Sequence, residues 1–365
     1  MLLPADPKAE FLAHAPEIRA AIERVLLSGH YILGPEVEAF EMEFSRYLGV
    51  DHSVGVANGT EAIELALRAA GVAPGDRVVT VANTVTATIS AIEQMGARPV
   101  FVEIDPDTMV MSSAALERVL SAGQPVKAVI PVHLYGHPAD MPAIMALSQA
   151  AGAAVIEDCA QAHGAMVAGR KAGAWGDFST FSFYPTKNLG AMGDGGAVCT
   201  ASAEAAERVR RLRQYGWRQR YIAESPGRNS RLDELQAAIL RVKLPLLDVG
   251  NARRRHLAAA YDERLAGLPL ATPFIAKGIE PVYHQYVIRT AQREALRAAL
   301  LPQGIQCGVL YPVPIHRQPA YVNPTLVLPE TERACAEVLC LPCHPGITLD
   351  DVETVSRAIR AFFQR

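Results

Sequence analysis

The hydrophobic pattern of residues 50–200 alternates between short apolar runs and longer segments in which apolar residues recur at helical spacing. Seven runs have the length and composition of strands. They are HSVGVAN (52–58), DRVVTVA (76–82), RPVFVEI (98–104), VKAVIPVHLY (126–135), AAVIEDC (153–159), FSTFSFY (178–184) and GGAVCT (195–200). This alternation predicts an α/β fold in which a mostly parallel, seven-stranded sheet is covered on both faces.

The pattern changes after Val198. It predicts helices over 203–214, 232–247 and 247–268, with an irregular polar loop over 215–229 between the first two. Weaker strands follow at YHQYVIRT (283–290) and IQCGVLYP (305–312), with helices at 293–301 and 351–363. We therefore expect a large domain over residues 1–245, which includes the N-terminal segment, and a smaller α+β domain over 246–365.

Composition narrows the class of ligand. Half of the 365 residues are hydrophobic, which is enough for a large core. The formal charge of −3 gives no basic surface for nucleic acid or anionic lipid, so we expect a small-molecule ligand. The first residues lack the basic flank and apolar run of a signal peptide, and no apolar window reaches membrane-spanning length. These features predict a cytoplasmic protein.

Six cysteines are scattered along the chain without the spacing of a disulfide framework, as in a cytosolic enzyme with reduced thiols. The segment CLPCH, Cys340 to His344, matches the haem-attachment pattern. Its central proline and the flanking Val338, Leu339 and Leu341 favour a buried core segment instead, and we expect no metal or haem.

Two polar segments follow predicted strands. In VANGTEAIELAL, Gly59 allows a close backbone approach, and Thr60 offers a cap and a hydroxyl group at a helix start whose free N–H groups suit a phosphate. The same residues also fit an ordinary helix cap. In VIEDCAQAH, Asp158 ends a buried strand, where a carboxylate requires a cation or a donor, although it could equally cap a following helix. Gln161 and His163 carry the same ambiguity.

Lys187 favours the catalytic interpretation of both segments. It follows the strand FSTFSFY, in YPTKNLG, and a lysine at such a sheet edge can form a Schiff base once its pKa is lowered. Pyridoxal 5'-phosphate requires a lysine for its aldehyde, an anion site for its phosphate and a carboxylate that keeps its ring nitrogen protonated. The sequence offers all three.

The chain resembles the DegT/DnrJ/EryC1/StrS family of sugar aminotransferases over nearly its whole length. The matching segments, in order, are GPEVEAFE, VANGTEAIELAL, GARPVFVEID, IPVHLYG, IEDCAQAHGA, FSFYPTKNLGAMGDGGAV, GRNSRLDELQAAIL and LYPVPIH. The resemblance implies the aspartate-aminotransferase architecture of fold-type I pyridoxal-phosphate enzymes.

The resemblance also implies roles for individual residues. Lys187 would form the imine with the cofactor and then move the substrate proton, Asp158 would pair with the ring nitrogen, and Gln161 would contact the phenolic oxygen. The implied phosphate contacts are Gly59, Thr60, Ser182 and, from the other subunit of a homodimer with shared sites, Asn229. The implied sugar-nucleotide contacts are Tyr31, Tyr184, Trp217, Arg220, Tyr221, Tyr311 and His316.

One position departs from the family pattern. Many relatives have an aromatic residue stacked on the cofactor ring where this chain has Val85. Valine covers the ring with apolar surface but cannot stack as a π system.

The expected activity is transfer of an amino group, with glutamate as the donor, to the keto carbon of a nucleotide-linked deoxysugar. QYGWRQRY and NSRLDELQAAILRVKL resemble the branch that aminates C3 of dTDP-3-keto-6-deoxyhexoses. Relatives that dehydrate sugars carry histidine at the position of Lys187, which disfavours a pyridoxal-phosphate-dependent dehydratase or lyase. A non-enzymatic regulator on the same fold is the other alternative, disfavoured by the presence of Lys187, Asp158 and Ser182.

Overall fold

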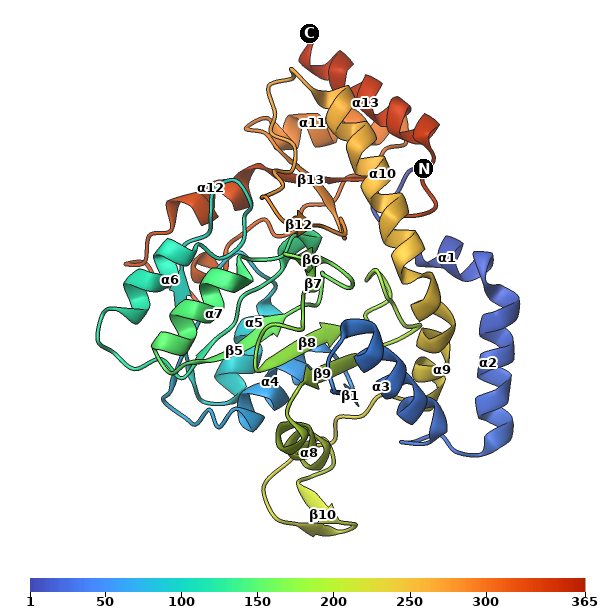
Figure 1. Cartoon of the computed structure of the whole chain (residues 1–365). Helices are drawn as coiled ribbons and strands as arrows, with labels where there is room; N and C mark the ends of the chain where they lie inside the picture. The colour runs from blue at the N-terminus through green and yellow to red at the C-terminus, as the bar shows by residue number, and fades with distance from the viewer. Residues whose placement is uncertain (365) are drawn as a thin grey trace.

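The computed structural model describes residues 1–364, and a seven-stranded sheet forms its centre (Figure 1). The strands lie in the spatial order β1 (His52–Val56), β9 (Gly196–Thr200), β8 (Phe178–Ser182), β5 (Ala154–Asp158), β4 (Ala128–Val129), β2 (Arg77–Val81) and β3 (Arg98–Val102). β9 runs antiparallel to β1 and β8, and all other neighbouring pairs are parallel. The predicted α/β class and the mostly parallel sheet are confirmed.

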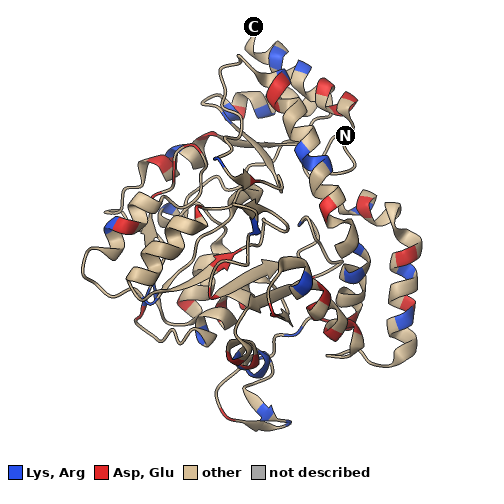
Figure 2. Cartoon of the chain, in the orientation of Figure 1, with Lys and Arg blue, Asp and Glu red and all other residues tan. Residues whose placement is uncertain are grey.

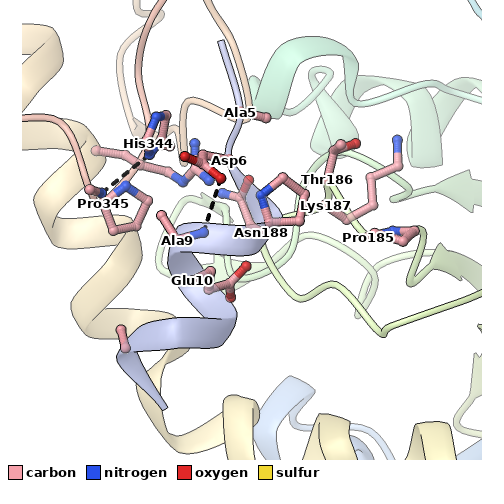
Figure 3. Close-up of a pocket in the computed structure, with 14 residues that line it drawn as sticks. Ala5, Asp6, Ala9, Glu10, Pro185, Thr186, Lys187, Asn188, His344 and Pro345 are labelled. Carbon is pink, nitrogen blue, oxygen red and sulfur yellow. Dashed lines mark hydrogen bonds between the residues drawn. The ribbon is translucent and has the colours of Figure 1, made fainter. Parts of the chain in front are cut away.

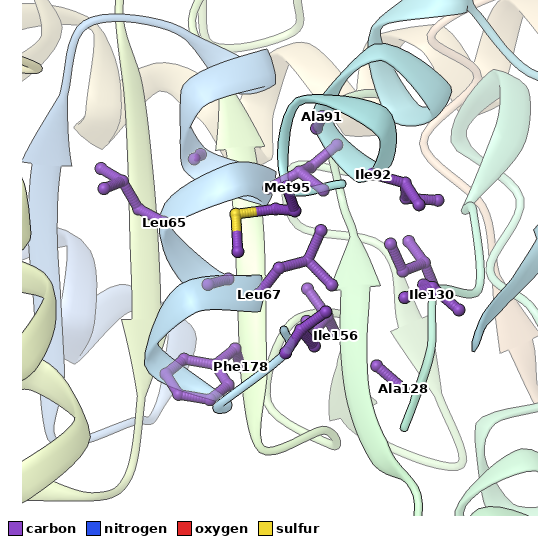
Figure 4. Packing of buried hydrophobic residues seen from close by; sticks show 14 of the residues in the cluster. Leu65, Leu67, Ala91, Ile92, Met95, Ala128, Ile130, Ile156 and Phe178 are labelled. Atoms are coloured by element: carbon purple, nitrogen blue, oxygen red, sulfur yellow. The ribbon is translucent and has the colours of Figure 1, made fainter. Parts of the chain in front are cut away.

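Side chains of the central strands alternate between two cores, as the period of two requires. Val78 and Ile156 belong to one core, and their neighbours Val79 and Val155 to the other. The first core is covered by α4 (Gly59–Ala69), α5 (Thr86–Gln94) and α8 (Ala203–Leu212). Figure 4 shows Leu67 of α4 next to Met95 beside the sheet, and Leu65 on the opposite side of the same helix.

Two groups of helices cover the other face of the sheet. α6 (Ser113–Leu120) and α7 (Met141–Ala150) pack against the strands near β3, and α3 (Pro35–Leu48) and α9 (Glu234–Lys243) pack against β8 and β9. α1 (Pro7–Ala13) and α2 (Ala15–Ser28) precede α3, and α2 packs along α9 at the edge of the molecule (Figure 1). Both faces of the parallel sheet are therefore buried.

The C-terminal part of the chain has a core of its own, seen at the top of Figure 1. Its elements are α10 (Leu247–Leu265), β12 (Ile279–Glu280), β13 (Tyr286–Arg289), α11 (Arg293–Leu300), α12 (Pro329–Glu337), β14 (Val338–Leu341) and α13 (Leu349–Phe363). β13 and β14 pair antiparallel. The predicted strand at 305–312 is wrong, because this segment forms only two isolated bridges, between Ile305 and Leu2 and between Gly308 and Cys340.

Several short elements complete the fold. β12 joins a small sheet with β6 (Met166–Val167) and β7 (Arg170–Lys171), and β10 (Trp217–Gln219) pairs with β11 (Ile222–Ala223). The β10–β11 hairpin lies within the segment predicted to be irregular and projects from the bottom of the molecule in Figure 1. The short 3₁₀ helices are Leu134–Gly136, Leu244–Leu246, Leu301–Gln303 and Ile315–Arg317.

The expected domain boundary near residue 245 lies in a continuous helical run, in which α9, the turn Leu244–Leu246 and α10 follow one another. Ile315 and Leu328, beyond this point, pack into the core beneath α4 and α5. The division into domains 1–245 and 246–365 therefore stays a prediction.

The surface and the cysteines match the composition. Figure 2 shows acidic and basic side chains interspersed over the outer helices, with no extended field of one sign in this view. All six cysteines are free and buried, and Cys340 and Cys343 lie in a core. Within residues 1–364, no helix has both the length and the apolar character needed to cross a membrane.

Candidate active site

The expected site residues lie where the parallel strands end. Gly59 and Thr60 follow β1, Asp158 ends β5, Ser182 ends β8, and Lys187 lies in the loop beyond β8. β1, β5 and β8 point in the same direction because β9 is antiparallel to both of its neighbours. Their carboxyl ends therefore meet at one edge of the sheet, where ligands of such folds bind.

The start of α4 provides a place for an anion. Asn58 is the N-cap, since its Oδ1 accepts a hydrogen bond from the Glu61 N–H at 2.9 Å. The expectation that Thr60 supplies this cap is wrong, because Thr60 already lies within the helix and its hydroxyl group is left for another partner. A Cβ atom on Gly59 would lie 2.7 Å from Cβ of Ser182, so glycine is required for this close approach.

Asp158 is 3% exposed, and both of its carboxylate oxygens have donors within the chain. Oδ2 accepts from the Thr88 hydroxyl at 3.0 Å, and Oδ1 accepts from the Ala160 N–H at 3.2 Å. Burial raises the pKa of the Asp158 carboxyl group, against the lowering effects of Ala160, Thr88 and the charge of Lys187. The alternative role as a helix cap is not observed, since turns rather than a helix follow β5.

Gln161 is fixed by two hydrogen bonds. Its Oε1 accepts from the Tyr135 N–H at 2.7 Å, and its Nε2 donates to the Tyr311 hydroxyl at 3.0 Å. Tyr135 has a positive φ of 58° and donates its own hydroxyl proton to the carbonyl of Leu310. An amide Nε2 carries two protons, so one donor of Gln161 stays available for an acceptor such as a phenolic oxygen.

Lys187 lies in a turn in which its N–H donates to the carbonyl of Tyr184 at 2.8 Å. Burial lowers the pKa of the Lys187 amine to about 8, although the charge of Asp158 acts to raise it. A substantial fraction of this amine is therefore neutral near physiological pH, as a nucleophile or a base requires.

The neighbour of Lys187 ties its loop to the C-terminal part of the chain. The Asn188 Nδ2 donates to Oδ1 of Asn251 at 2.8 Å and to the carbonyl of Val282 at 3.1 Å. Its Oδ1 lies 3.2 Å from Nδ1 of His284. These contacts with α10 and the segment before β13 hold the lysine loop in place.

Two buried histidines also lie in the surroundings of Lys187. His163 packs against the rings of Phe181 and Phe183, and neither of its ring nitrogens has a hydrogen-bond partner. Burial and the charge of Lys187 lower the pKa of His163 to about 3, and the same two causes lower the pKa of His284 well below its usual value. Both rings are therefore neutral near physiological pH.

A cavity of about 180 Å³ adjoins the lysine loop (Figure 3). It lies between the N-terminal segment around Asp6 and Glu10, the turn that includes Asn188, and the segment around His344. The side chain of Lys187 points away from Asp6 and His344 in Figure 3. The cavity thus adjoins the backbone of the lysine loop on the side opposite to the reactive amine.

A second polar cluster, His133, Glu157 and Cys159, is fully buried. The Glu157 carboxylate already accepts hydrogen bonds from the backbone N–H groups of Gly173, Trp175 and Gly176, and its Oε2 lies 3.0 Å from Nε2 of His133. A metal ion would have to displace these donors. The cluster therefore fixes the loop before β8.

The expected substrate contacts are dispersed. Tyr311 lies in the site through its bond to Gln161, whereas His316 is completely buried and its Nε2 lies 3.0 Å from Glu332. Tyr31 and Tyr184 are exposed. Val85, expected to contact the cofactor rather than the substrate, is the N-cap residue of α5, and this role also stays a prediction. In the hairpin, Tyr221 contacts both Trp217 and Arg220. The substrate roles of these residues stay predictions.

Asn229 lies on an exposed segment that is anchored on both sides. Arg228 binds Glu61 at 2.8 Å and also contacts Glu64 of α4, and the Ser230 hydroxyl accepts from the Ala57 N–H at 3.2 Å. The Asn229 side chain itself is exposed. Its role at the partner's phosphate stays a prediction.

The residues present fit pyridoxal 5'-phosphate. The fit rests on the donor set: an anion-binding helix start beside a glycine that leaves no room for a Cβ, a buried carboxylate, a free amide donor and an amine with a lowered pKa. Sequence reasoning did not identify Thr88, Tyr135 and His284, because their partners lie far away in the chain.

Known proteins share this sequence and fold along the whole chain. The family described as DegT/DnrJ/EryC1/StrS aminotransferases matches residues 13–360. The chain is 46% identical to the dTDP-3-amino-3,4,6-trideoxy-alpha-D-glucose transaminase of Streptomyces venezuelae, over 99% of this chain and 96% of that protein. It is 43% identical to the UDP-N-acetyl-3-dehydro-alpha-D-glucosamine 3-aminotransferase of Acidithiobacillus ferrooxidans, over 97% and 96%.

A solved structure supports the same conclusion. The crystal structure of S. venezuelae DesV in complex with a ketimine intermediate superposes with a TM-score of 0.97 at 46% identity, and the match covers 100% of this chain and 99% of that one. The protein therefore belongs to the DegT/DnrJ/EryC1/StrS aminotransferase family.

Proposed function

We propose that this protein is a pyridoxal-phosphate-dependent aminotransferase that transfers an amino group from glutamate to C3 of a dTDP-linked 3-keto-6-deoxyhexose. The observation that carries the proposal is the combination of a Lys187 amine whose pKa is about 8 with the buried Asp158 carboxylate at one edge of the sheet. Such a pair suits reversible bonding to an aldehyde and the transfer of a proton at carbon.

The chain's own groups would hold the cofactor and the proton. The Gly59 and Thr60 N–H groups and the Ser182 hydroxyl would bind the phosphate, Asp158 the ring nitrogen and Gln161 Nε2 the phenolic oxygen. Pyridoxal phosphate, when bound, supplies an electron sink for the negative charge that develops on the carbon that loses its proton. Lys187 Nζ accepts that proton in its neutral form and returns it from its ammonium form.

The position of amination has broader support than the carrier. The two relatives described above both act at C3 by name, but one takes a dTDP-linked and the other a UDP-linked sugar. We choose dTDP because the relative with 46% identity carries that nucleotide in its name. The aminated carbon and the nucleotide carrier therefore need separate tests.

We also propose that the enzyme is a cytoplasmic homodimer with shared sites. The exposed Asn229 is held on a rigid segment by Arg228 and Ser230, so its amide is positioned to donate to an anion outside its own chain. A symmetric dimer would exchange this contribution reciprocally. Buried, unpaired cysteines suit the reducing cytoplasm.

The test is a substrate panel. The protein is loaded with pyridoxal phosphate and incubated with glutamate and 3-keto or 4-keto sugars on dTDP, UDP and GDP, and mass spectrometry follows the products. We expect replacement of the keto oxygen by an amino group on the dTDP-linked 3-keto sugar and none with Lys187→Ala. Loss of a sugar hydroxyl group instead of a gain of nitrogen would establish a dehydratase. No product on any sugar, with the cofactor bound, would favour a regulator.

A further inference from the structure

Two buried threonines and Asp158 form a chain of hydrogen bonds at the ends of two strands. The Thr88 hydroxyl lies 3.0 Å from Asp158 Oδ2 and 3.0 Å from the hydroxyl of Thr84. Thr84, Thr88 and Asp158 are at most 3% exposed. The contact joins α5 to the end of β5, across 70 positions of sequence.

The direction of the protons in this chain follows from the number of donors. An ionised carboxylate only accepts, and each hydroxyl group has one proton to donate. The Thr88 hydroxyl therefore donates its proton to Asp158 Oδ2 and accepts a hydrogen bond from the Thr84 hydroxyl. If Asp158 were protonated at Oδ2, it would be the donor and both threonines would have to turn. The present order thus stabilises the charged form of the carboxylate.

The helix does not require this use of the Thr88 hydroxyl. Thr88 lies in the first turn of α5, and Thr84, four residues earlier, lies before the N-cap Val85 and therefore outside the helix. The hydroxyl of Thr88 bonds to two side chains, one of them the carboxylate that faces the proposed cofactor. A buried hydroxyl group that donates a hydrogen bond to a carboxylate stabilises the ionised form of that carboxylate. The arrangement therefore has an electrostatic effect in addition to its effect on packing.

The effect of the Thr88 hydroxyl on Asp158 can be distinguished from the effects of the other groups around this carboxylate. Burial disfavours the ionised form of the Asp158 carboxyl group. The Ala160 N–H, the ammonium form of Lys187 in the loop beyond β8, and His133, which follows β4, favour the ionised form. The charge of Lys187 is lost whenever its nitrogen gives up its proton. The hydroxyl of Thr88 and the N–H of Ala160 are the neutral donors that persist throughout.

We propose that Thr88, oriented by Thr84, is a positioning residue that keeps the Asp158 carboxylate ionised and fixed toward the ring nitrogen of the cofactor. The inference rests on the proposed pyridoxal-phosphate function. It assigns to Thr84 and Thr88 a role in holding the proton on that nitrogen, rather than in binding substrate.

The test measures the ring nitrogen directly. The wild-type protein and its variants are loaded with pyridoxal phosphate labelled with ¹⁵N in the ring, and the ¹⁵N chemical shift is recorded against pH. The variants are Thr88→Val, which keeps the shape, Thr88→Ser, which keeps the hydroxyl, and Thr84→Val, which removes only the donor to Thr88. Thr80→Val is the control, because the buried Thr80 donates to the carbonyl of Ile130 at 2.9 Å and not to Asp158.

We expect the midpoint at which the nitrogen loses its proton to fall by about one pH unit in Thr88→Val, the size of one hydrogen bond to a charged group. Thr84→Val should shift it less, in the same direction, and Thr88→Ser and Thr80→Val should keep the wild-type midpoint. Equal midpoints in Thr88→Val and the wild type would overturn the inference. If Thr88→Val does not fold, the midpoint in Thr84→Val is used instead: a lower midpoint than in the wild type supports the inference, and an equal midpoint overturns it. A wild-type protein that does not bind the cofactor would contradict the proposed function instead.

Discussion

The buried end of the active site and the exposed β10–β11 hairpin are built in opposite ways. At the buried end, polar atoms of Asp158 and Gln161 are paired by groups from helix α5 and from turns and loops of the same chain. In the hairpin, Trp217 and Tyr221 contact one another, and Tyr221 is 73% exposed. One region is preorganised within a single chain, and the other exposes aromatic surface.

The first way to test this comparison is to remove the reactive group of the buried end. Lys187→Ala should lower turnover by at least ~10⁴-fold, because both the covalent link and the proton carrier are lost. Thermal unfolding should be little changed. Purified protein is treated with borohydride and examined by peptide mass spectrometry, with Lys127→Ala, an exposed lysine, as the control. Cofactor that is still fixed to the Lys187→Ala chain would show that another lysine reacts.

The second test keeps the shape of the buried end and removes its charge. Asp158→Asn should lower turnover by roughly 10²- to 10³-fold, because the ring nitrogen loses the electrostatic partner that holds its proton. The cofactor should still bind, as a visible absorption titration would show. Near-normal turnover would mean that Asp158 does not pair with the cofactor.

A third test addresses the phosphate end. Gly59→Ala places a Cβ atom 2.7 Å from Cβ of Ser182 and should weaken cofactor binding by about tenfold or more, since a shift of the helix start loses hydrogen bonds to the phosphate. Gly250→Ala in α10 is the matched control, because its Cβ would meet only Pro345 Cγ at 3.6 Å. Equal affinity for the cofactor in the two variants would show that Gly59 does not lie at the cofactor site.

The fourth test asks whether the exposed segment completes a neighbouring site. Lys187→Ala is mixed with a variant that carries Asn229→Asp and Tyr221→Ala, under conditions in which subunits exchange. Each homodimer should be nearly inactive, but a mixed dimer should contain one intact site and reach up to about half of the wild-type activity. If both variants are folded and dimeric and exchange restores nothing, Asn229 acts within its own chain.

The smallest expected effect is a shift in pH dependence. The neutral amine of Lys187 reacts with an aldehyde, so capture of the cofactor by the cofactor-free protein should rise with pH to a midpoint near 8 and then level off, rather than rise toward 10.5. Asp158→Asn should lower the midpoint further, because the charge of Asp158 raises the pKa of the amine. Stopped-flow absorbance gives the rates, and a midpoint near 10.5 would contradict the burial argument.

The parts of the site that sequence predicted are those placed by strand direction. Once the parallel strands β1, β5 and β8 end at Val56, Asp158 and Ser182, the topology brings the residues that follow or end them to one edge, and the family motifs suggest their roles. The hydrogen bond from Thr88 to Asp158 could not be predicted in the same way. It depends on how α5 packs, and the local pattern around Thr88 fits an ordinary amphipathic helix.

The strand error after residue 300 has a similar cause. The apolar runs 305–312 and 338–341 both suit a strand next to β13. The structure pairs Val338–Leu341 with β13, and leaves the first run with two isolated bridges, at Ile305 and Gly308. Periodicity cannot choose between two such candidates, because the choice depends on contacts between distant segments.

The burial of the six cysteines has a consequence for chemoselectivity. A thiolate adds readily to an aldehyde, so an exposed, acidic cysteine would compete with Lys187 for the cofactor. Burial raises the pKa of all six thiols, to about 11 for Cys343 and about 12 for Cys199, while it lowers the pKa of Lys187 to about 8. The same physical effect thus suppresses the reactivity of the thiols and favours that of the Lys187 amine.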